Sequence, residues 1–314
     1  MLISPPVVSQ ARTTPSLSEG AVAGMRWIAP GAFVMGSDDH YPEERPARTV
    51  TVAGFWIDRA PVTNQEFADF VAATGHMTLA ERVPTASDYP DARPELLVAG
   101  SAVFVQPPAP VPLDHESRWW SYVPGASWRQ PEGPRSSLAE RDEHPVVHIA
   151  LEDALAYAVW AGKALPTEEE WERAARGGSD RTPFAWGEEL APRGRFMANT
   201  WHGEFPWLNT AADGFVGTSP VGSFPPNGYE LVDMIGNVWE WTTTSSGTSG
   251  PSVAAPCCAP PPEPRGKEQR IIKGGSYLCS PEYCARYRPA ARQLLDADST
   301  TSHLGFRCVS RRPA

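Results

Sequence analysis

Prolines and glycines interrupt this chain so often that they limit the length of its regular elements. The 314 residues include 34 prolines and 26 glycines. Proline lacks the backbone N–H that helices and central strands need, and glycine loses the most conformational freedom when an element forms. Twelve tryptophans can pin irregular segments to a core through their large rings. The composition therefore predicts a compact, loop-rich α+β fold rather than a helical bundle or a doubly wound sheet.

The charge balance and the cysteine usage limit the partners and the compartment. A formal net charge of −10 argues against nucleic-acid binding and mildly favours a basic peptide as substrate. No apolar run approaches the roughly 20 residues of a membrane span, and the N-terminus lacks the pattern of a signal peptide. The five cysteines are an odd number that fits a disulfide framework poorly. We therefore expect a cytoplasmic protein with no membrane or nucleic-acid partner, and separately we expect a monomer.

Local patterns predict short elements separated by long loops. Capping boxes at Thr63–Glu66 and Thr167–Glu170 each open a helix, and Gly75 and Gly177 can close them. A further helix is expected over about 152–163. Strand patterns predict a hairpin over residues 25–36 and further strands over 48–57, 236–241, 270–274 and 304–309. Residues 84–135 show little periodicity and are interpreted as long ordered loops.

The domain organisation follows from composition. Residues 1–24 are interpreted as a disordered lead, and residues 25–314 as a single catalytic domain without internal repeats. Residues 243–268 are rich in Ser, Thr and Gly and then in Pro, which predicts a flexible surface insertion. Because the neighbouring cysteines Cys257 and Cys258 lie inside that insertion, we interpret them as incidental to the chemistry.

Two cysteines near the C-terminus, Cys279 and Cys284, are the strongest chemical signal. On a helix their spacing would place them about 140° apart, and on a strand it would place them on opposite faces. Gly274, Gly275 and Pro281 permit the bend that would bring the sulfurs together. From the residues alone, two thiols at such a bend form either a disulfide or a site for a soft metal ion.

Short motifs recur at separated points of the chain: Phe33–Gly36, Pro61–Asn64, Pro145–His148, Trp160–Lys163, Leu165–Trp171, Ala198–Asn199, Gly203–Pro206, Pro225–Tyr229, Gly236–Trp241, Lys273–Ser276 and Gly305–Arg307. Through them the chain resembles the formylglycine-generating enzymes of bacterial type, also called sulfatase-modifying factors, over roughly residues 25 to 310. Most of these motifs mark only a wider superfamily, a variant of the C-type-lectin-like fold that also contains non-catalytic modules and iron enzymes. Gly274, Gly275 and Ser276 followed by the cysteine pair mark the catalytic branch.

The resemblance implies an oxidase that uses O2 and copper to convert the cysteine of a Cys-x-Pro-x-Arg segment in an unfolded sulfatase to Cα-formylglycine. Soft thiolates select Cu(I), so Cys279 and Cys284 are the expected copper ligands. The alternative is a non-catalytic peptide-binding module of the same fold, which would need no thiol pair. An iron-dependent sulfoxide synthase is disfavoured, because residues 1–24 cannot supply the histidine-rich helical domain that it requires.

Further residues of the site are expected around the cysteine pair. Ser276 and Tyr283 flank the pair, and the resemblance also places Trp239 there. For these three the competing interpretation is packing. The arginines at 286, 288 and 292 either offset thiolate charge or form structural ion pairs with the excess carboxylates, and we favour the ion pairs.

The resemblance also implies two structural calcium sites built from loop oxygens, which suit Ca2+ as a hard cation. The alternative is a solvated acidic loop. The first site comprises the side chains of Asn199 and Asp213 with the carbonyls of Thr200 and Phe215. The second comprises Asp233 and Glu240 with the carbonyls of Gly236 and Val238. The family has an asparagine where this chain has Asp233, which preserves an oxygen ligand.

Three other residues are interpreted as structural or peripheral. His144 and His148 have helical metal-ligand spacing, but the residues between them indicate a short strand, so both are expected to be structural. His303 stands where the family has an asparagine and is expected to border the groove. Family disulfides are not expected, because the positions corresponding to their helix cysteines are alanines, which leaves Cys308 without its family partner.

Overall fold

The structure is a computed structural model that describes residues 22–90, 92–179, 181–245 and 268–312. The strands are β1 Met25–Ile28, β2 Gly31–Met35, β3 Arg48–Val52, β4 Phe55–Asp58, β5 Gly100–Phe104, β6 Trp120–Pro124, β7 Trp239–Ser245, β8 Gln269–Lys273, β9 Arg292–Asp296, β10 Leu304–Gly305 and β11 Val309–Ser310. The helices are α1 Asn64–Thr74, α2 Leu151–Trp160 and α3 Glu168–Arg176, with short 3-10 turns that include η2 Pro42–Glu44. The predicted loop-rich α+β class is confirmed.

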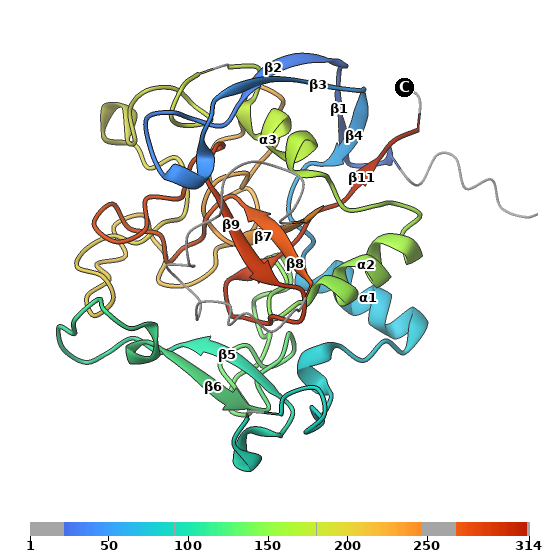
Figure 1. Ribbon diagram of the computed structural model, residues 1–314, viewed down its shortest axis with the longest axis vertical. Helices are drawn as coiled ribbons and strands as arrows, with labels where there is room; N and C mark the ends of the chain where they lie inside the picture. The colour runs from blue at the N-terminus through green and yellow to red at the C-terminus, as the bar shows by residue number, and fades with distance from the viewer. Residues whose placement is uncertain (1–21, 91, 180, 246–267, 313–314) are drawn as a thin grey trace, which may run out of the picture.

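The strands form four small sheets within the described residues. The order β10-β7-β8-β9 makes the largest, and β1-β4-β11 makes a second. The ribbons β2-β3 and β5-β6 lie toward opposite ends of the molecule, with the largest sheet between them (Figure 1). α3 packs against β8, β7 and β2, so it joins the largest sheet to the first ribbon. No helix in the described part of the chain is long and apolar enough to cross a membrane.

The helices begin and end where their caps predict. Thr63 accepts a hydrogen bond from the backbone N–H of Glu66, and Thr167 does the same for Glu170. Gly75 and Gly177 end the two helices in the left-handed region, with φ of 71° and 60°. These caps satisfy backbone groups locally, which explains why sequence alone located both helices.

The predicted hairpin over residues 25–36 is wrong in its pairing, although both strands exist. β1 pairs antiparallel with β4, and β2 pairs with β3. Trp27 and Trp56 face each other across β1 and β4 with ring centroids 5.4 Å apart, a contact that the hairpin could not provide. The predicted strand over 48–57 is likewise two strands, interrupted before Phe55. A Cβ at Gly54 would lie 2.5 Å from the Trp27 ring.

Two segments interpreted as irregular contain strands. Residues 84–135 hold the hairpin β5-β6, which is paired from Gly100 with Pro124 to Phe104 with Trp120. The predicted insertion over 243–268 begins too early, because β7 continues to Ser245 and pairs with Arg270 of β8. Residues 246–267 of that insertion, with Cys257 and Cys258, lie outside the described residues, as does nearly all of the predicted lead. The strand predicted over 304–309 is instead two short strands in different sheets.

Candidate active site around two buried thiols

The segment that carries the cysteines connects two neighbouring strands of the largest sheet. β8 ends at Lys273 and β9 begins at Arg292, and these two residues are paired across the sheet. Gly275, with φ of 72°, lies against the backbone of Arg286, so that an added Cβ would meet the Arg286 carbonyl oxygen at 2.9 Å. The segment is therefore a closed loop whose two halves touch at a glycine.

The bend predicted at the cysteine pair is present. The sulfurs of Cys279 and Cys284 lie 3.4 Å apart, and both side chains are fully buried. Both residues are thiols rather than a disulfide. The backbone N–H of Ser276 donates to the Cys279 sulfur at 3.4 Å, a contact that stabilises negative charge on it. The pair is thus a dry dithiol that one soft ion can bridge.

The Cys279 half of the loop is held by backbone hydrogen bonds from other loops. Trp201 N–H donates to the Cys279 carbonyl at 3.0 Å, and Tyr277 N–H donates to the Asn237 carbonyl at 3.0 Å. Gly236 N–H donates to the Gly274 carbonyl at 2.9 Å. The chain at 199–201 and 236–237, where both calcium sites are predicted, therefore fixes this half.

Aromatic rings cover the loop next to Cys284. Tyr283 stacks on Phe205 with centroids 4.7 Å apart and meets Trp119 edge-on at 5.4 Å. Trp201 packs against Phe205 as well. Pro281 at the loop tip is exposed, whereas the thiols are not. The rings therefore pack the residue next to Cys284 into the core, while the tip of the loop is exposed.

Ser276 and Trp239, two further predicted site residues, are both buried. Ser276 is fully buried, and its hydroxyl accepts from Leu278 N–H at 3.2 Å. Trp239 is fully buried, and its indole N–H has no hydrogen-bond partner among the described residues. The Trp239 backbone N–H donates to the carbonyl of His303, whose ring nitrogen Nε2 also has no partner in the described chain. Burial lowers the pKa of His303 to about 3, so the ring is neutral near pH 7.

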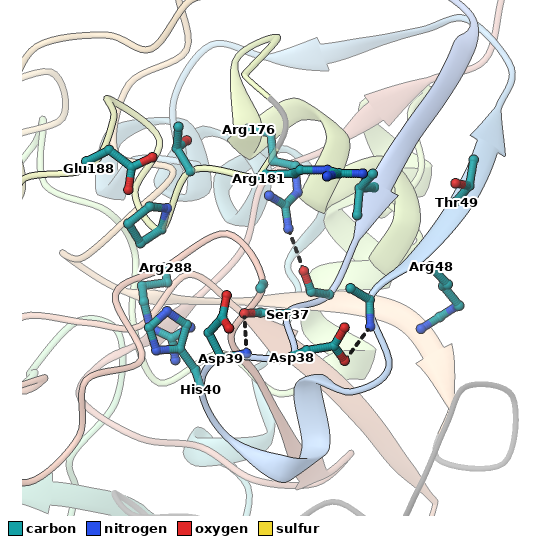
Figure 2. A pocket seen from close by; sticks show the side chains of 16 residues that line it. Ser37, Asp38, Asp39, His40, Arg48, Thr49, Arg176, Arg181, Glu188 and Arg288 are labelled. Carbon is teal, nitrogen blue, oxygen red and sulfur yellow. Dashed lines mark hydrogen bonds between the residues drawn. The ribbon is translucent and has the colours of Figure 1, made fainter.

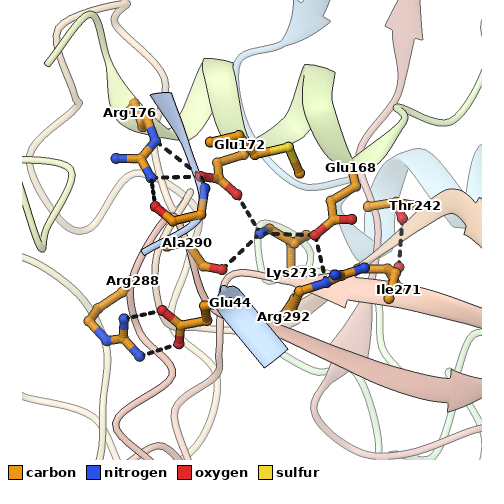
Figure 3. Close-up of polar contacts among 12 residues, drawn as sticks. Glu44, Glu168, Glu172, Arg176, Thr242, Ile271, Lys273, Arg288, Ala290 and Arg292 are labelled. Atoms are coloured by element: carbon orange, nitrogen blue, oxygen red, sulfur yellow. Dashed lines mark hydrogen bonds and ion pairs between the residues drawn. The ribbon is translucent and has the colours of Figure 1, made fainter. Parts of the chain in front are cut away.

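The arginines that follow the cysteines form buried ion pairs, as favoured from the sequence. Arg286 pairs with Glu43 at 2.5 Å, and Arg288 binds both carboxylate oxygens of Glu44. Arg292 lies 2.9 Å from Glu168. Figure 3 shows the last two pairs with Lys273, which bonds Glu172 at 2.9 Å. Sequence reasoning missed the glutamates at 43 and 44, although three arginines in an apolar setting signalled that carboxylates were needed.

The residues of the first predicted calcium site lie together. Asp213 accepts hydrogen bonds from the backbone N–H groups of Thr200 at 3.2 Å and Phe215 at 3.1 Å. Asn199 is buried beside them, and its amide donates to the Gly217 carbonyl at 2.9 Å. His202 lies 3.3 Å from the Asp213 carboxylate. The buried Asp213 carboxylate and the Asn199 amide supply oxygen atoms of the kind that Ca2+ prefers. The groups of Thr200 and Phe215 that contact Asp213 are N–H donors, so calcium at this site stays a prediction.

The second predicted calcium site fits a cation less well. Both carboxylate oxygens of Glu240 accept from Arg307 at 2.7 Å, and one also accepts from the Trp171 indole at 2.7 Å. Arg307 further donates to the Asp233 carbonyl at 3.1 Å. Burial raises the pKa of Asp233 to about 6. A guanidinium therefore already balances Glu240, and calcium at Asp233, Gly236, Val238 and Glu240 stays a prediction.

The two histidines with metal-ligand spacing lie in structural contacts. His148 is buried and bonds Ser101 at 2.7 Å and the Pro131 carbonyl at 2.8 Å through its two ring nitrogens. Its φ of 62° and the single bridge at Pro145 show that the short strand predicted there is wrong. Cys308 is a buried thiol outside any disulfide, and burial raises its pKa well above the usual range.

A polar cavity of about 590 Å3 borders the loop without containing its sulfurs. Its walls include residues 36–40, Arg48, Arg176, Arg181 and Arg288. Figure 2 shows acidic Asp38, Asp39 and Glu188 among these arginines. The cavity therefore carries both signs of charge and does not coincide with the thiol site.

Known proteins place the chain in a family. A family profile described as "Sulfatase-modifying factor enzyme 1-like domain" matches residues 10–312. A formylglycine-generating enzyme of Mycobacterium tuberculosis is 53% identical over 89% of this chain and 95% of its own length. One from Thermomonospora curvata is 46% identical over 95% of this chain and 96% of its own. The chain belongs to the sulfatase-modifying factor family, and both of these relatives are described as formylglycine-generating enzymes.

Structural and sequence relatives also show what membership leaves open. The structure of PvdO from Pseudomonas aeruginosa matches 91% of this chain and 93% of its own, with a TM-score of 0.57 and 26% identity. A mouse relative described as inactive Cα-formylglycine-generating enzyme 2 is 40% identical over 89% of this chain and 83% of its own. Because an inactive relative is this similar, activity has to be argued from the site.

Proposed function

We propose that this protein is a copper-dependent oxidase that uses O2 to convert the cysteine of a Cys-x-Pro-x-Arg segment in unfolded sulfatases to Cα-formylglycine. The observation that carries the proposal is the dithiol: two fully buried sulfurs 3.4 Å apart that are not joined as a disulfide. Relatives named as formylglycine-generating enzymes at 53% and 46% identity support the reaction class.

The donor set of the dithiol fits Cu(I). Soft sulfur ligands select this ion, and the described residues contain no converging group of three or more His, Cys, Asp and Glu side chains. Cys279 and Cys284 would therefore be its two protein ligands, which leaves room for the sulfur of a substrate cysteine. Bound there, Cu(I) would supply the redox chemistry that a closed-shell protein needs in order to use O2.

The residues around the thiols have distinct tasks in this proposal. Ser276 N–H stabilises charge on the Cys279 sulfur. Tyr283, with Phe205 and Trp119 against it, excludes water from the reacting thiol. The indole N–H of Trp239, which lacks a partner in the described chain, can donate a hydrogen bond to a reacting oxygen. Each task uses a group that the local fold already holds in place.

The overall reaction requires an external reductant. The thiol-bearing carbon of the substrate loses one hydrogen and its sulfur, which leaves as hydrogen sulfide, while one oxygen atom enters as the aldehyde. Reducing O2 fully takes four electrons, of which oxidation of the substrate carbon supplies two. Two further thiols become a disulfide and supply the remaining two electrons, and the second oxygen atom leaves as water.

The experiment that tests the proposal is direct turnover. The reduced protein, loaded with Cu(I), is incubated under air with a Cys-x-Pro-x-Arg peptide and a thiol reductant. The mass of the peptide is then measured by mass spectrometry. We expect the mass change for loss of hydrogen sulfide and gain of one oxygen, together with capture of the aldehyde by a hydroxylamine probe. An unchanged peptide mass with fully loaded copper would refute the oxidase and favour the alternative, a non-catalytic peptide-binding module.

Several finer predictions accompany this function. We propose structural Ca2+ at Asn199, Thr200, Asp213 and Phe215, supported by the convergence of those residues. We also propose a cytoplasmic location, supported by the odd cysteine count, and activity as a monomer. Membership of the C-type-lectin-like fold group rests on the family resemblance.

A further inference from the structure

A short turn far away in sequence holds the residues that follow Cys284. The turn comprises Tyr41 and the 3-10 turn η2, Pro42–Glu44. The Tyr41 hydroxyl accepts a hydrogen bond from Ala285 N–H at 3.1 Å, and its ring lies 4.0 Å from the Arg286 guanidinium carbon. The first contact is made by the residue that directly follows Cys284 in the chain.

Two consecutive glutamates of that turn bind two arginines of the cysteine loop. Glu43 pairs with Arg286 at 2.5 Å, and Glu44 binds Arg288 through both oxygens at 2.7 and 2.5 Å. Arg288 Nε also donates to the Ala285 carbonyl at 2.9 Å. All four charged side chains are at most 5% exposed. We refer to residues 41–44 bound to residues 285–288 as the clamp.

The turn is itself fixed to the sheet that carries the loop. Ser37 N–H donates to the Glu44 carbonyl at 3.2 Å, and Gly36 N–H donates to the Glu172 carboxylate at 2.7 Å. Glu172 in turn binds Lys273 at the end of β8. The turn is therefore connected at one end to Lys273, where the cysteine loop begins, and at the other end to the residues that follow Cys284.

Stability alone is a poor explanation for this arrangement. Buried ion pairs lose most of their attraction to the cost of removing two charges from water, and apolar residues of similar size often serve stability as well. Their better attested use is to fix one register among several, because a displaced charge would be left unpaired. Here the register that is fixed is that of Ala285–Arg288, and hence the position of Cys284.

We propose that the clamp positions the sulfur of Cys284 opposite that of Cys279, and that Tyr41, Glu43 and Glu44 are positioning residues of the thiol site. The inference rests on the proposed function in one respect, namely that the two thiols act as one site. What it adds to that function is the positioning of Cys284 by residues 41–44, a segment distant in the chain. A variant with a weakened clamp keeps both thiols. Their sulfurs would meet less often, so the effective concentration of one thiol near the other would be lower.

Two clamp variants and one control test this assignment. Tyr41→Phe removes the acceptor for Ala285 N–H and keeps the ring. Glu44→Gln combined with Arg288→Met removes both charges of one pair, so that neither remains buried without its counterpart. The control is Asp58→Asn, which breaks the 2.6 Å pair with Lys163 elsewhere in the fold. Folding of each reduced protein is checked by thermal unfolding, and all measurements are made below the transition.

Two readouts follow the thiols themselves. The first is the affinity for Cu(I), measured by competition with a chromophoric Cu(I) chelator. The second is the state of the thiols in buffers of reduced and oxidised glutathione, in which Cys279 and Cys284 form either the intramolecular disulfide or mixed disulfides with glutathione. We expect each clamp variant to lose about tenfold or more in Cu(I) affinity. We also expect less intramolecular disulfide and more mixed disulfide than in the parent, with the control unchanged.

The outcomes separate this inference from the proposed function. Folded clamp variants that match the parent in both readouts would overturn the positioning role and leave the copper proposal standing. A parent protein that fails to bind Cu(I) would overturn the copper proposal, while the glutathione readout still decides the clamp. If the double variant does not fold, Tyr41→Phe alone decides, since it removes the hydroxyl that accepts from Ala285 N–H and removes no charge. A control that changes as much as the clamp variants would also overturn the inference.

Discussion

The two sulfurs of the site are held from different sides by different chemistry. Cys279 is fixed by neutral backbone hydrogen bonds from the loops at 199–201 and 236–237, where calcium is predicted. Cys284 is followed at once by the clamp, in which Glu43 and Glu44 bind Arg286 and Arg288. Neutral hydrogen bonds hold irregular loops in place only while the loops keep their shape, which a bound cation can help to fix. Buried ion pairs instead fix which residues meet, because a displaced charge would be left unpaired. The same 3.4 Å contact should therefore respond to different treatments on its two sides.

Removing either sulfur gives the largest expected effect and tests whether both halves serve one site. We expect Cys279→Ala and Cys284→Ala each to lower turnover of the Cys-x-Pro-x-Arg peptide on the order of 10³-fold or more, because groups that act as a unit fail together. Peptide mass after incubation with Cu(I) and air provides the measurement. Substantial activity in either variant would show that the halves do not form one centre.

A methyl group at Gly275, where the two halves of the cysteine loop touch, should force those halves apart. In Gly275→Ala the new Cβ would meet the Arg286 carbonyl oxygen at 2.9 Å, at a φ of 72°. We expect a loss of about 2–4 kcal/mol in the free energy of unfolding, from left-handed strain and overpacking together. Gly75→Ala is the matched control, since its φ is 71° and nothing lies within 4 Å. If urea unfolding gives equal losses in the free energy of unfolding for the two variants, the close approach of Gly275 to Arg286 is contradicted.

Removing calcium should act on the Cys279 half and spare the clamp. If Ca2+ binds at Asp213, chelation lowers the free energy of unfolding by about 2–3 kcal/mol relative to a roughly hundredfold excess of Ca2+ over its dissociation constant. Thermal unfolding with and without chelator measures this difference. The variant Asp213→Asn should lose the response, whereas the Glu44→Gln, Arg288→Met variant should keep it. A parent protein indifferent to chelator would remove calcium from the account of this half.

Mild acid should also lower the stability of the fold, because the ring of His303, an electrostatic neighbour of Cys284, is buried. Burial lowers the pKa of His303 from 6.5 to about 3, so the unfolded chain binds a proton at a pH where the folded protein does not. Stability is therefore fully present above about pH 6.5 and falls as the pH decreases toward 3. The loss reaches about 2 kcal/mol by about pH 5 from this residue alone. The free energy of unfolding, measured with urea across this pH range, should decrease less steeply with falling pH in His303→Asn than in the parent. An unchanged pH dependence would exclude His303 as the cause of the loss.

Sequence located the features whose partners are near in the chain. The capping boxes at Thr63 and Thr167 and the bend at the cysteine pair depend on residues within a few positions, so their patterns were readable directly. Helices, thiols and the loop-rich class were therefore predictable because their causes are local.

The long-range features were not predictable in the same way. Glu43 and Arg286 are separated by 243 positions in the chain, and the polar stretch around Glu43 has the composition of an exposed loop. β1 and β4 pair because Trp27 packs on Trp56, a choice that alternation alone does not reveal. The sequence therefore indicated that Arg286 and Arg288 needed carboxylates, but the fold decided which carboxylates they were.

X-ray absorption at the copper edge tests the central claim most directly. The account predicts one Cu(I) per reduced chain with two sulfur neighbours, and a third sulfur neighbour when a Cys-x-Pro-x-Arg peptide is added without O2. Cys279→Ala and Cys284→Ala should each lose one sulfur neighbour or fail to bind the ion. A copper environment of nitrogen and oxygen, or a spectrum unchanged in either variant, would contradict the assignment of the two buried thiols as the catalytic centre.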